Sequence, residues 1–150
     1  MNVMANQWTE DETQGLGMLS RIMRNDLNRA LRPMGLNDSN YFFIFFIADH
    51  PGASQDDLVR AVILDHSTIA RSVAKLVKIG YLVRQPDPVD GRASRLFLTP
   101  RGEEIKYQLI PITQHAMSLV FDNLTPTEQE TVQALLTKSA HRHEKERENL

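Results

Sequence analysis

The chain has 150 residues, of which 41% are hydrophobic and 24% are charged, and this composition is typical of one globular domain. It contains no cysteine, which excludes disulfide frameworks, thiolate metal sites and cysteine nucleophiles. The longest apolar run, Tyr41–Ala48, is far shorter than the roughly 20 residues of a membrane span. The polar first residues have no signal-peptide layout. We therefore expect a cytoplasmic protein with no membrane contact.

The formal net charge of -2 is unevenly distributed along the chain. Residues 1–59 contain 4 basic and 8 acidic residues, residues 60–106 contain 9 and 5, and residues 107–150 contain 4 and 6. The central segment is therefore basic and both flanks are acidic. This distribution is typical of a small face that binds nucleic acid, although charge scatter of this size also arises by chance.

The N-terminal region is predicted to begin with a long helix. Thr9 followed three residues later by Glu12 is a capping-box pattern. Apolar residues then recur every three or four positions, at Leu16, Leu19, Met23, Leu27, Ala30 and Leu31. Because Pro33 disfavours a helical conformation in the residue before it and Gly35 follows, the helix is expected to end near Arg32.

The run Tyr41–Ile47 contains aromatic and aliphatic residues with no periodicity. Its length allows a buried strand or a buried helix. Three candidate N-caps, Asn37, Asp38 and Ser39, precede it, and a His-Pro-Gly turn follows. These flanking residues favour a helix that is covered on more than one side.

The next segment predicts two short helices joined by a brief turn. Ser54 is the expected N-cap of the first helix, whose first turn is acidic, as the helix dipole favours. Asp65 is the expected N-cap of the second helix, and Gly80 lies just beyond its end. This is the helix-turn-helix pattern.

Two strands and two further helices are predicted to follow. Tyr81–Gln85 and Arg95–Thr99 have strand composition, and the polar segment 86–93 between them contains turn residues, which predicts a β-hairpin. Thr99-Pro100 and Thr125-Pro126 each predict the start of a helix. The predicted fold class is therefore mainly α with a small β-hairpin.

The second helix of the pair is expected to have an apolar and a polar face. The apolar stripe contains Ile69, Val73 and Leu76. The opposite face and its shoulder contain Ser67, Thr68, Arg71, Ser72, Lys75 and Lys78. In the major groove of DNA, arginine binds guanine, hydroxyl groups bind several bases and lysine neutralises phosphate. A solvated amphipathic helix is the alternative interpretation.

The predicted hairpin strengthens the DNA-binding interpretation. Its tip carries Arg92, with Arg95 close behind. A narrow minor groove has a deep negative potential that attracts an inserted arginine. A basic helix face beside an arginine-bearing loop therefore predicts contact with both grooves of a duplex.

Three motifs occur in a specific order and spacing. They are Gly80-Tyr81-Leu82-Val83-Arg84, Asp87-Pro88-Val89-Asp90-Gly91-Arg92-Ala93 and Leu98-Thr99-Pro100-Arg101-Gly102. They resemble the recognition-helix exit, the Asp-Xaa-Arg wing motif and the Leu-Thr-Xaa-Xaa-Gly helix start of the MarR family of winged-helix transcription regulators. The resemblance extends from about Leu16 to Leu136, which is most of the chain.

This resemblance implies a homodimeric transcription regulator and not an enzyme. It implies a single domain over residues 1–150, with a winged helix-turn-helix lobe at 37–100 flanked by dimerisation helices at 9–36 and 101–147. The wide apolar faces of the flanking helices independently favour a symmetric dimer. Two recognition helices would then bind a pseudo-palindromic operator in double-stranded DNA, with half-sites about 10 bp apart.

The helix face, the wing and the resemblance together predict the DNA-contacting positions. They are Ser54, Gln55, His66, Ser67, Thr68, Arg71, Ser72, Lys75, Lys78, Asp90, Arg92 and Arg95. We expect Ser67, Thr68 and Arg71 to read bases, Lys75 and Lys78 to bind phosphates, and Arg92 to enter the minor groove. By similarity, Asp90 would orient an arginine of the wing or of the recognition helix.

The resemblance further suggests a ligand-responsive repressor. Relatives typically admit a small aromatic or amphipathic effector between the dimer helices and the DNA-binding lobe. Tyr41 and Phe45 would line such a cavity, and Arg21 and Arg24 would hold a carboxylate. Plain core packing of the aromatic run, with both arginines solvated, is the alternative. Because cysteine is absent, an effector would act by reversible binding that shifts the population of two states.

Rival interpretations come from other classes. One is a winged-helix protein-interaction module without DNA binding, and another is a metal-responsive regulator that uses some of His50, His115, His141 and His143. Isolated histidines and a charged tail are more often ordinary surface or core residues, so no metal or cofactor is predicted. The adjacent Asp65-His66-Ser67 cannot form a catalytic triad, because neighbours on a helix point about 100° apart.

Overall fold

The computed structural model describes residues 7–148, with side chains described as far as residue 141. Within this range the elements follow the order α1 (Glu10–Leu31), η2 (Arg32–Met34), α2 (Tyr41–Asp49), α3 (Gln55–Ala61), α4 (His66–Ile79), β1 (Leu82–Pro86), β2 (Ser94–Leu98), α5 (Pro100–Phe121) and α6 (Pro126–Glu148). Here η2 is a short 3-10 helix and the two strands form one antiparallel sheet. The predicted fold class, mainly α with a small β-hairpin, is confirmed.

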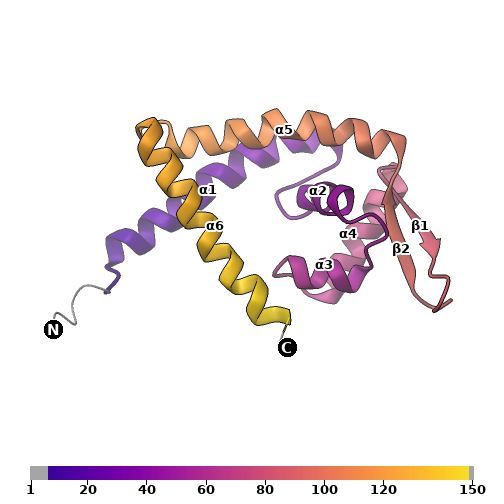
Figure 1. The fold of residues 1–150 in the computed structure, drawn as a ribbon. Helices are drawn as coiled ribbons and strands as arrows, with labels where there is room; N and C mark the ends of the chain where they lie inside the picture. Colours follow the sequence, from indigo (N-terminus) through magenta and orange to yellow (C-terminus); the bar gives the residue numbers. More distant parts are fainter. Residues whose placement is uncertain (1–6, 149–150) are drawn as a thin grey trace.

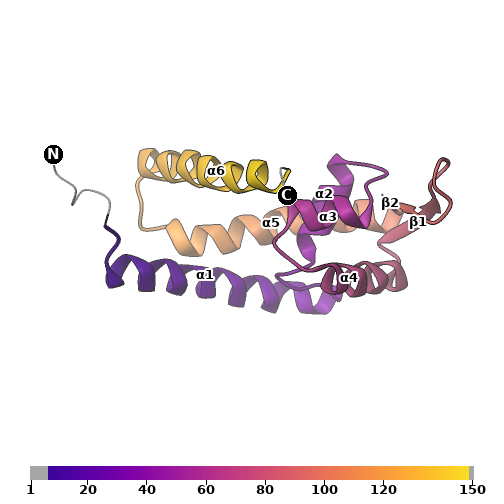
Figure 2. The ribbon, with the colours of Figure 1, turned by 90° about the horizontal axis from the view of Figure 1, so that it is seen from below.

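Helices α1 and α5 lie side by side along the molecule (Figure 1). Helices α2, α3 and α4 gather near one end, with the hairpin on the outside of that end. Helix α6 leaves the other end of α5 and runs back toward α3, as a second view also shows (Figure 2). Within residues 7–148, no helix has both the length and the apolarity needed to cross a membrane.

The N-cap residues predicted for α1, α3 and α4 are confirmed. The backbone N–H of Thr9 donates to the Glu12 carboxylate at 2.6 Å, which completes the capping box of α1. Ser54 and Asp57 form the same arrangement at α3. Asp65 caps α4 by accepting a backbone N–H of its first turn. These helix boundaries therefore follow from a few polar side chains.

The aromatic run forms the helix α2, as predicted, but the prediction of its N-cap was wrong. The cap is Asn40, not Asn37, Asp38 or Ser39. The Asn37 side-chain oxygen accepts the backbone N–H groups of Ser39 and Asn40 at 2.9 and 3.1 Å. Asn37 therefore stabilises the turn that precedes the helix, and α2 begins at Tyr41, the first residue of the aromatic run.

The hydrophobic core lies where α1, α2, α4, α5 and the hairpin meet. Its most buried side chains include Leu27, Leu31, Phe43, Ile44, Ile47, Leu58, Ile69, Val73, Leu76, Tyr81, Leu82, Leu96 and Leu109. Burying one large apolar side chain stabilises the fold by roughly 1.5–3 kcal/mol. Helix α2 contributes three of these residues, which explains its lack of a polar face.

The hairpin is anchored to the turn between α2 and α3. Its strands pair from Leu82 opposite Leu98 to Pro86 opposite Ser94, each strand displaced by one residue from its predicted span. Leu96 also exchanges backbone hydrogen bonds with that turn, accepting from Gly52 and donating to Ala53, both at 2.8 Å. The base of the wing is therefore fixed to the lobe.

The end of α4 is joined to the start of α5. Gly80, with a φ of 95°, ends α4 in the left-handed conformation. The carbonyl of Gly80 accepts a hydrogen bond from the hydroxyl of Thr99, which is the N-cap of α5. The Arg101 guanidinium donates to the carbonyl of Ile79 at 2.8 Å and lies 5.2 Å from the centroid of the Tyr81 ring. These contacts fix the two helices relative to each other.

Gly102 permits this close junction. A Cβ atom at this position would lie 2.2 Å from the backbone carbonyl oxygen of Tyr81. Backbone atoms cannot give way as a flexible side chain can. Only glycine therefore fits at this point of the Leu-Thr-Xaa-Xaa-Gly motif without displacement of the chain.

Candidate nucleic-acid interface

Helix α4 separates an apolar stripe from a basic face, as its sequence predicts. The stripe, which is fully buried, consists of Ile69, Val73 and Leu76. Arg71, Lys75 and Lys78 are exposed on the other side. Among the described residues, none of these three cations has an ion pair or hydrogen bond. The basic face is therefore open to an external anion.

The first turn of α4 carries one carboxylate and two hydroxyl groups. Asp65 Oδ1 accepts the Thr68 backbone N–H at 2.7 Å and the Ser67 hydroxyl at 2.8 Å, and Oδ2 accepts the Thr68 hydroxyl at 3.1 Å. These hydrogen bonds, led by the one from the Thr68 backbone, lower the pKa of Asp65 to about 2. The sequence predicts Asp65 as a helix cap, but it does not predict that Asp65 also accepts hydrogen bonds from both hydroxyl groups.

The start of α3 is capped by its own Ser54 and also contacts α4. Ser54 and Gln55 are half-buried there. Ser54 Oγ accepts the backbone N–H of Asp57 at 3.1 Å, so this serine is a helix cap in the free chain. His66 Nδ1 of α4 lies 3.5 Å from Asp56 Oδ1 of α3, and this contact joins the two helices of the helix-turn-helix.

The wing tip is organised by Asp87. Its Oδ1 accepts the backbone N–H groups of Val89 and Asp90 at 2.8 and 3.2 Å, and its Oδ2 accepts Nε–H of Arg95 at 3.2 Å. These bonds, led by that of the Val89 backbone, lower the pKa of Asp87. Asp90 accepts the backbone N–H of Arg92 at 3.1 Å. In the described chain Asp87 pairs with the side chain of Arg95, and the orientation of an arginine by Asp90 stays a prediction.

Sequence reasoning missed Asp87, although a signal for it was present. An aspartate two residues before the exposed part of a turn often accepts backbone N–H groups from that turn. Arg92, by contrast, is exposed at the tip, and its guanidinium has no hydrogen bond or ion pair within the described chain. The hairpin that carries Arg92 projects beside α4 (Figure 1), so the wing and the basic face lie at the same end of the molecule.

Known proteins resemble this chain in sequence and in fold. A MarR family model matches residues 34–93. The chain is 31% identical over 137 residues to the HTH-type transcriptional regulator BilQ of Clostridium symbiosum (strain WAL-14163), and the alignment covers 85% of this chain and 95% of that protein. The chain belongs to the MarR family.

Solved MarR structures have the same fold. A crystal structure of MarR superposes with a TM-score of 0.84 at 26% identity, covering 98% of this chain and 99% of the other. A mutant MarR from E. coli, complexed with operator DNA, superposes with a TM-score of 0.75 at 24% identity, covering 87% and 94%. The superposition on MarR confirms the predicted winged-helix fold. MarR-family proteins are transcriptional regulators and not enzymes.

Two histidines of this MarR-family chain, His50 and His115, have partners nearby. His50 Nδ1 lies 3.0 Å from the carbonyl oxygen of Phe46, and its ring stacks on the Phe46 ring. His115 Nδ1 lies 2.8 Å from Oδ2 of the buried Asp26 and so joins α5 to α1. In the part of the chain that the structure describes, no group of three His, Asp or Glu side chains is placed to hold a metal ion. The His143 side chain lies outside the described residues.

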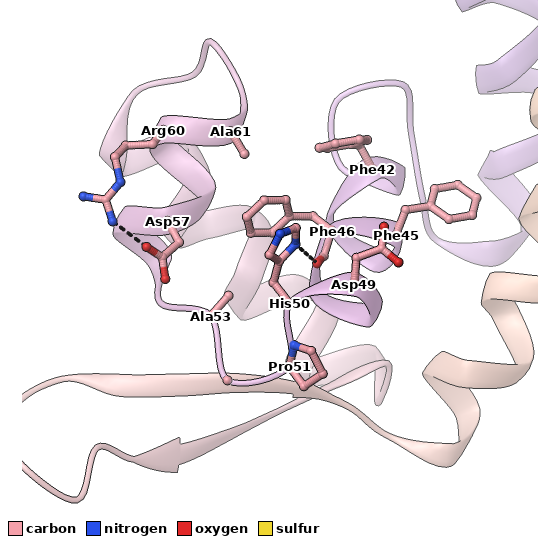
Figure 3. Close-up of a pocket in the computed structure, with 11 residues that line it drawn as sticks. Phe42, Phe45, Phe46, Asp49, His50, Pro51, Ala53, Asp57, Arg60 and Ala61 are labelled. Atoms are coloured by element: carbon pink, nitrogen blue, oxygen red, sulfur yellow. Dashed lines mark hydrogen bonds and ion pairs between the residues drawn. The ribbon is translucent and has the colours of Figure 1, made fainter. Parts of the chain in front are cut away.

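A pocket of about 730 Å³ lies between α2, the turn after it, and α3 (Figure 3). Phe45 lines it together with Phe42 and Phe46, and the ion pair of Asp57 with Arg60 lies across from the Phe46 ring. The pocket therefore combines aromatic surface with a charged pair.

The other candidate effector residues lie elsewhere. The Tyr41 ring contacts the Phe45 ring edge-on, with centroids 6.4 Å apart, but does not line the pocket. Arg24 Nε forms an ion pair with Asp38 Oδ2 at 2.5 Å, and Arg21 is exposed on α1. The structure thus brings Phe45 to the pocket and leaves the two arginines away from it.

Proposed function

We propose that this MarR-family protein is a homodimeric repressor that binds a pseudo-palindromic DNA operator and releases it in response to a small ligand. The observation that carries the proposal is the exposed basic face of α4, which has no carboxylate partner in the described chain and lies beside the Arg92 wing. A mutant MarR from E. coli with a similar fold is solved in complex with operator DNA, which supports DNA binding by this fold.

Each predicted contact has a role in this proposal. The major groove admits an α-helix, so α4 enters it with Ser67, Thr68 and Arg71 toward base edges. Lys75 and Lys78 neutralise phosphates. Further contacts come from Ser54, Gln55, His66 and Ser72 around α4, and from Asp90, Arg92 and Arg95 in the wing. Arg92 enters the minor groove, where narrow A·T-rich segments attract arginine.

The dimer interface is proposed on the long helices, over residues 9–36 and 101–147, with residues 37–100 as the DNA-binding lobe. Large apolar side chains are exposed on or beside these helices, at Trp8, Leu16, Met18, Ile22, Tyr107, Ile110, Met117, Leu119, Leu135 and Leu136. Apolar surface of this extent marks an interaction site, and two-fold pairing is the commonest way to cover it.

Two substitutions on α4 test DNA binding. An operator is first selected from randomised duplexes, and affinities are then measured by fluorescence anisotropy at several salt concentrations. Arg71→Ala is expected to weaken cognate binding by about 1–3 kcal/mol and to relax discrimination at one base pair. Lys78→Ala is expected to weaken all duplexes alike and to lower the salt slope by about 1.

Lys138→Ala, which removes an equally exposed cation from α6, is the matched control and should leave affinity unchanged. Equal affinity of the wild type, Arg71→Ala and Lys78→Ala for every duplex would favour the protein-interaction module instead. Absence of any duplex binding at low ionic strength would do the same.

Ligand response is tested separately by a thermal-shift screen of phenolic and carboxylate compounds. A compound that binds only the folded state raises Tm. We expect such a compound to lower operator affinity, and Phe45→Ala to reduce its effect because Phe45 lines the pocket. Compounds that raise Tm without any change in operator affinity would contradict ligand-responsive repression.

A further inference from the structure

The hydroxyl groups of Ser67 and Thr68 have a fixed polarity. A hydroxyl group has one proton to donate and two lone pairs that accept. Both protons are donated to the Asp65 carboxylate, at 2.8 Å from Ser67 and 3.1 Å from Thr68. An ionised carboxylate has no proton to give in return. Toward any further partner, each hydroxyl oxygen therefore presents only lone pairs.

Asp65 keeps this polarity under ordinary conditions. Its carboxylate also accepts the backbone N–H of Thr68 at 2.7 Å, so the same group caps the helix and holds the hydroxyl groups. Its pKa of about 2 keeps it ionised at neutral pH. Asp65 and Ser67 are both exposed, and Thr68 is half-buried, so the arrangement faces solvent.

We infer that Asp65 makes the first turn of α4 an acceptor-only reader of base edges, so that Ser67 and Thr68 select the exocyclic amino groups of adenine and cytosine. In the major groove these amino groups are the donors, whereas guanine O6 and N7 and thymine O4 are acceptors. The inference rests on the proposed function, in which α4 enters the major groove. Asp65 acts through the two hydroxyl groups and is therefore a positioning residue.

The next turn of α4 has the opposite polarity. Arg71 lies four residues after Ser67, on the same side of the helix, and a guanidinium only donates. Guanine, with two acceptors at its major-groove edge, is its best partner. The operator half-site is therefore expected to place an amino-bearing base near a guanine.

The test uses the full-length protein and its selected operator duplex. Each adenine of one half-site is replaced in turn by purine, which lacks the N6 amino group, and each cytosine by pyrimidin-2-one, which lacks the N4 amino group. These changes also weaken base pairing, so wild type and Ser67→Ala or Thr68→Val are compared on the same duplexes. At one or two positions the wild type should lose about three- to tenfold more affinity than the variant.

Asp65→Asn tests the positioning role. Asparagine caps helices as well as aspartate does, so the start of α4 should persist, which circular dichroism checks. The amide N–H₂ now donates to a hydroxyl oxygen and frees that hydroxyl proton for DNA. Renewed selection should therefore shift the preferred base edge at that position from an amino group toward guanine O6 or thymine O4.

Ser39→Ala is the control, because it removes an exposed hydroxyl group from the turn before α2, outside the proposed DNA contacts, and should leave the amino preference intact. Equal sensitivity of wild type, Ser67→Ala and Thr68→Val to every amino deletion would overturn the inference, and so would unchanged base selection by Asp65→Asn. Both results leave the proposed function standing as long as Arg71→Ala weakens operator binding. Loss of all duplex binding by the wild type would overturn the proposed function itself.

Discussion

The lobe formed by α2, α3, α4 and the hairpin, and the long helices beside it, use apolar residues in opposite ways. In the lobe, Phe43, Leu76 and Leu96 are completely buried within one chain. On α6, Leu135 and Leu136 are 56% and 44% exposed. A lobe with a complete core can present a fixed polar surface, whereas uncovered apolar surface of this extent marks an interaction site. Under the proposed function, recognition and assembly are therefore separated along the chain.

The largest effect is expected from a cavity in the lobe. Leu76→Ala removes a fully buried side chain of α4 and should lower the free energy of unfolding by about 2–5 kcal/mol. Urea unfolding followed by circular dichroism measures this change. Val89→Ala, at the exposed wing tip, should change stability by less than about 0.5 kcal/mol. Similar losses for both variants would show that the lobe does not hold its own core.

The next effect concerns assembly. In the proposed dimer, the double variant Leu135→Glu, Leu136→Glu should raise the dissociation constant by about a hundredfold or more, because burying a leucine side chain at an interface contributes roughly 1.5–3 kcal/mol and each glutamate would place a charge there. Sedimentation should show the variant as a 17.1 kDa species and the wild type at twice that mass. Gln133→Glu, an exposed polar position on the same helix, is the control. A wild type that sediments as the single chain would contradict the proposal that the long helices pair two subunits.

Adding one methyl group at the junction between α4 and α5 should lower the stability of the protein. Gly102→Ala forces a Cβ against the Tyr81 carbonyl and should destabilise the protein by about 1–3 kcal/mol. Gly17→Ala, on α1 with nothing within 4 Å of the added Cβ, should instead stabilise it by about 0.5–1 kcal/mol. Thermal unfolding compares the two. Equal Tm values would mean that the close junction is not required.

A smaller effect is expected at the wing. Asp87→Asn keeps an oxygen that accepts the turn N–H groups but removes the negative charge that holds Arg95. The released guanidinium can then reach phosphate, so duplex affinity should increase and the salt slope should rise by up to about 1. Anisotropy titrations at several salt concentrations measure both. Asp122→Asn, at the far end of α5, should change neither.

The smallest effect is the response to acid. Because the pKa values of Asp65 and Asp87 are lower in the folded chain than in the unfolded chain, both carboxylates stabilise the fold above their ordinary pKa, near 4. For Asp65 this contribution is lost as the pH falls from about 4 toward 2, and for Asp87 it is lost as the pH falls below about 4. Asp65→Asn should therefore show a shallower fall in Tm between pH 5 and pH 2 than the wild type. Parallel curves would contradict a depressed pKa for Asp65.

Most of the fold follows from local signals in the sequence. The caps at Thr9, Ser54 and Asp65, together with Gly80, set helix boundaries through contacts within a few residues. The two faces of α4 follow from its helical periodicity. The N-cap of α2 was missed because Asn37 hydrogen-bonds two backbone groups of its own turn.

Side-chain pairing across elements could not be predicted from local patterns. Arg24 is paired with Asp38, which lies beyond the end of α1 and meets it only after the chain turns back. The wing contains two aspartates, and the register of the hairpin decides that Asp87 pairs with Arg95. Such pairings depend on the three-dimensional path of the chain.

The junction of α4 with α5 has a consequence for signalling. Arg101 donates to the carbonyl of Ile79, the last residue of α4, and Gly102 lets the start of α5 approach the backbone of Tyr81. If α5 pairs the two subunits as proposed, its orientation sets the distance and the angle between the two α4 helices. A rotation of α5 at the subunit contact would then move α4 through the hydrogen bonds of Thr99 and Arg101 to the end of α4.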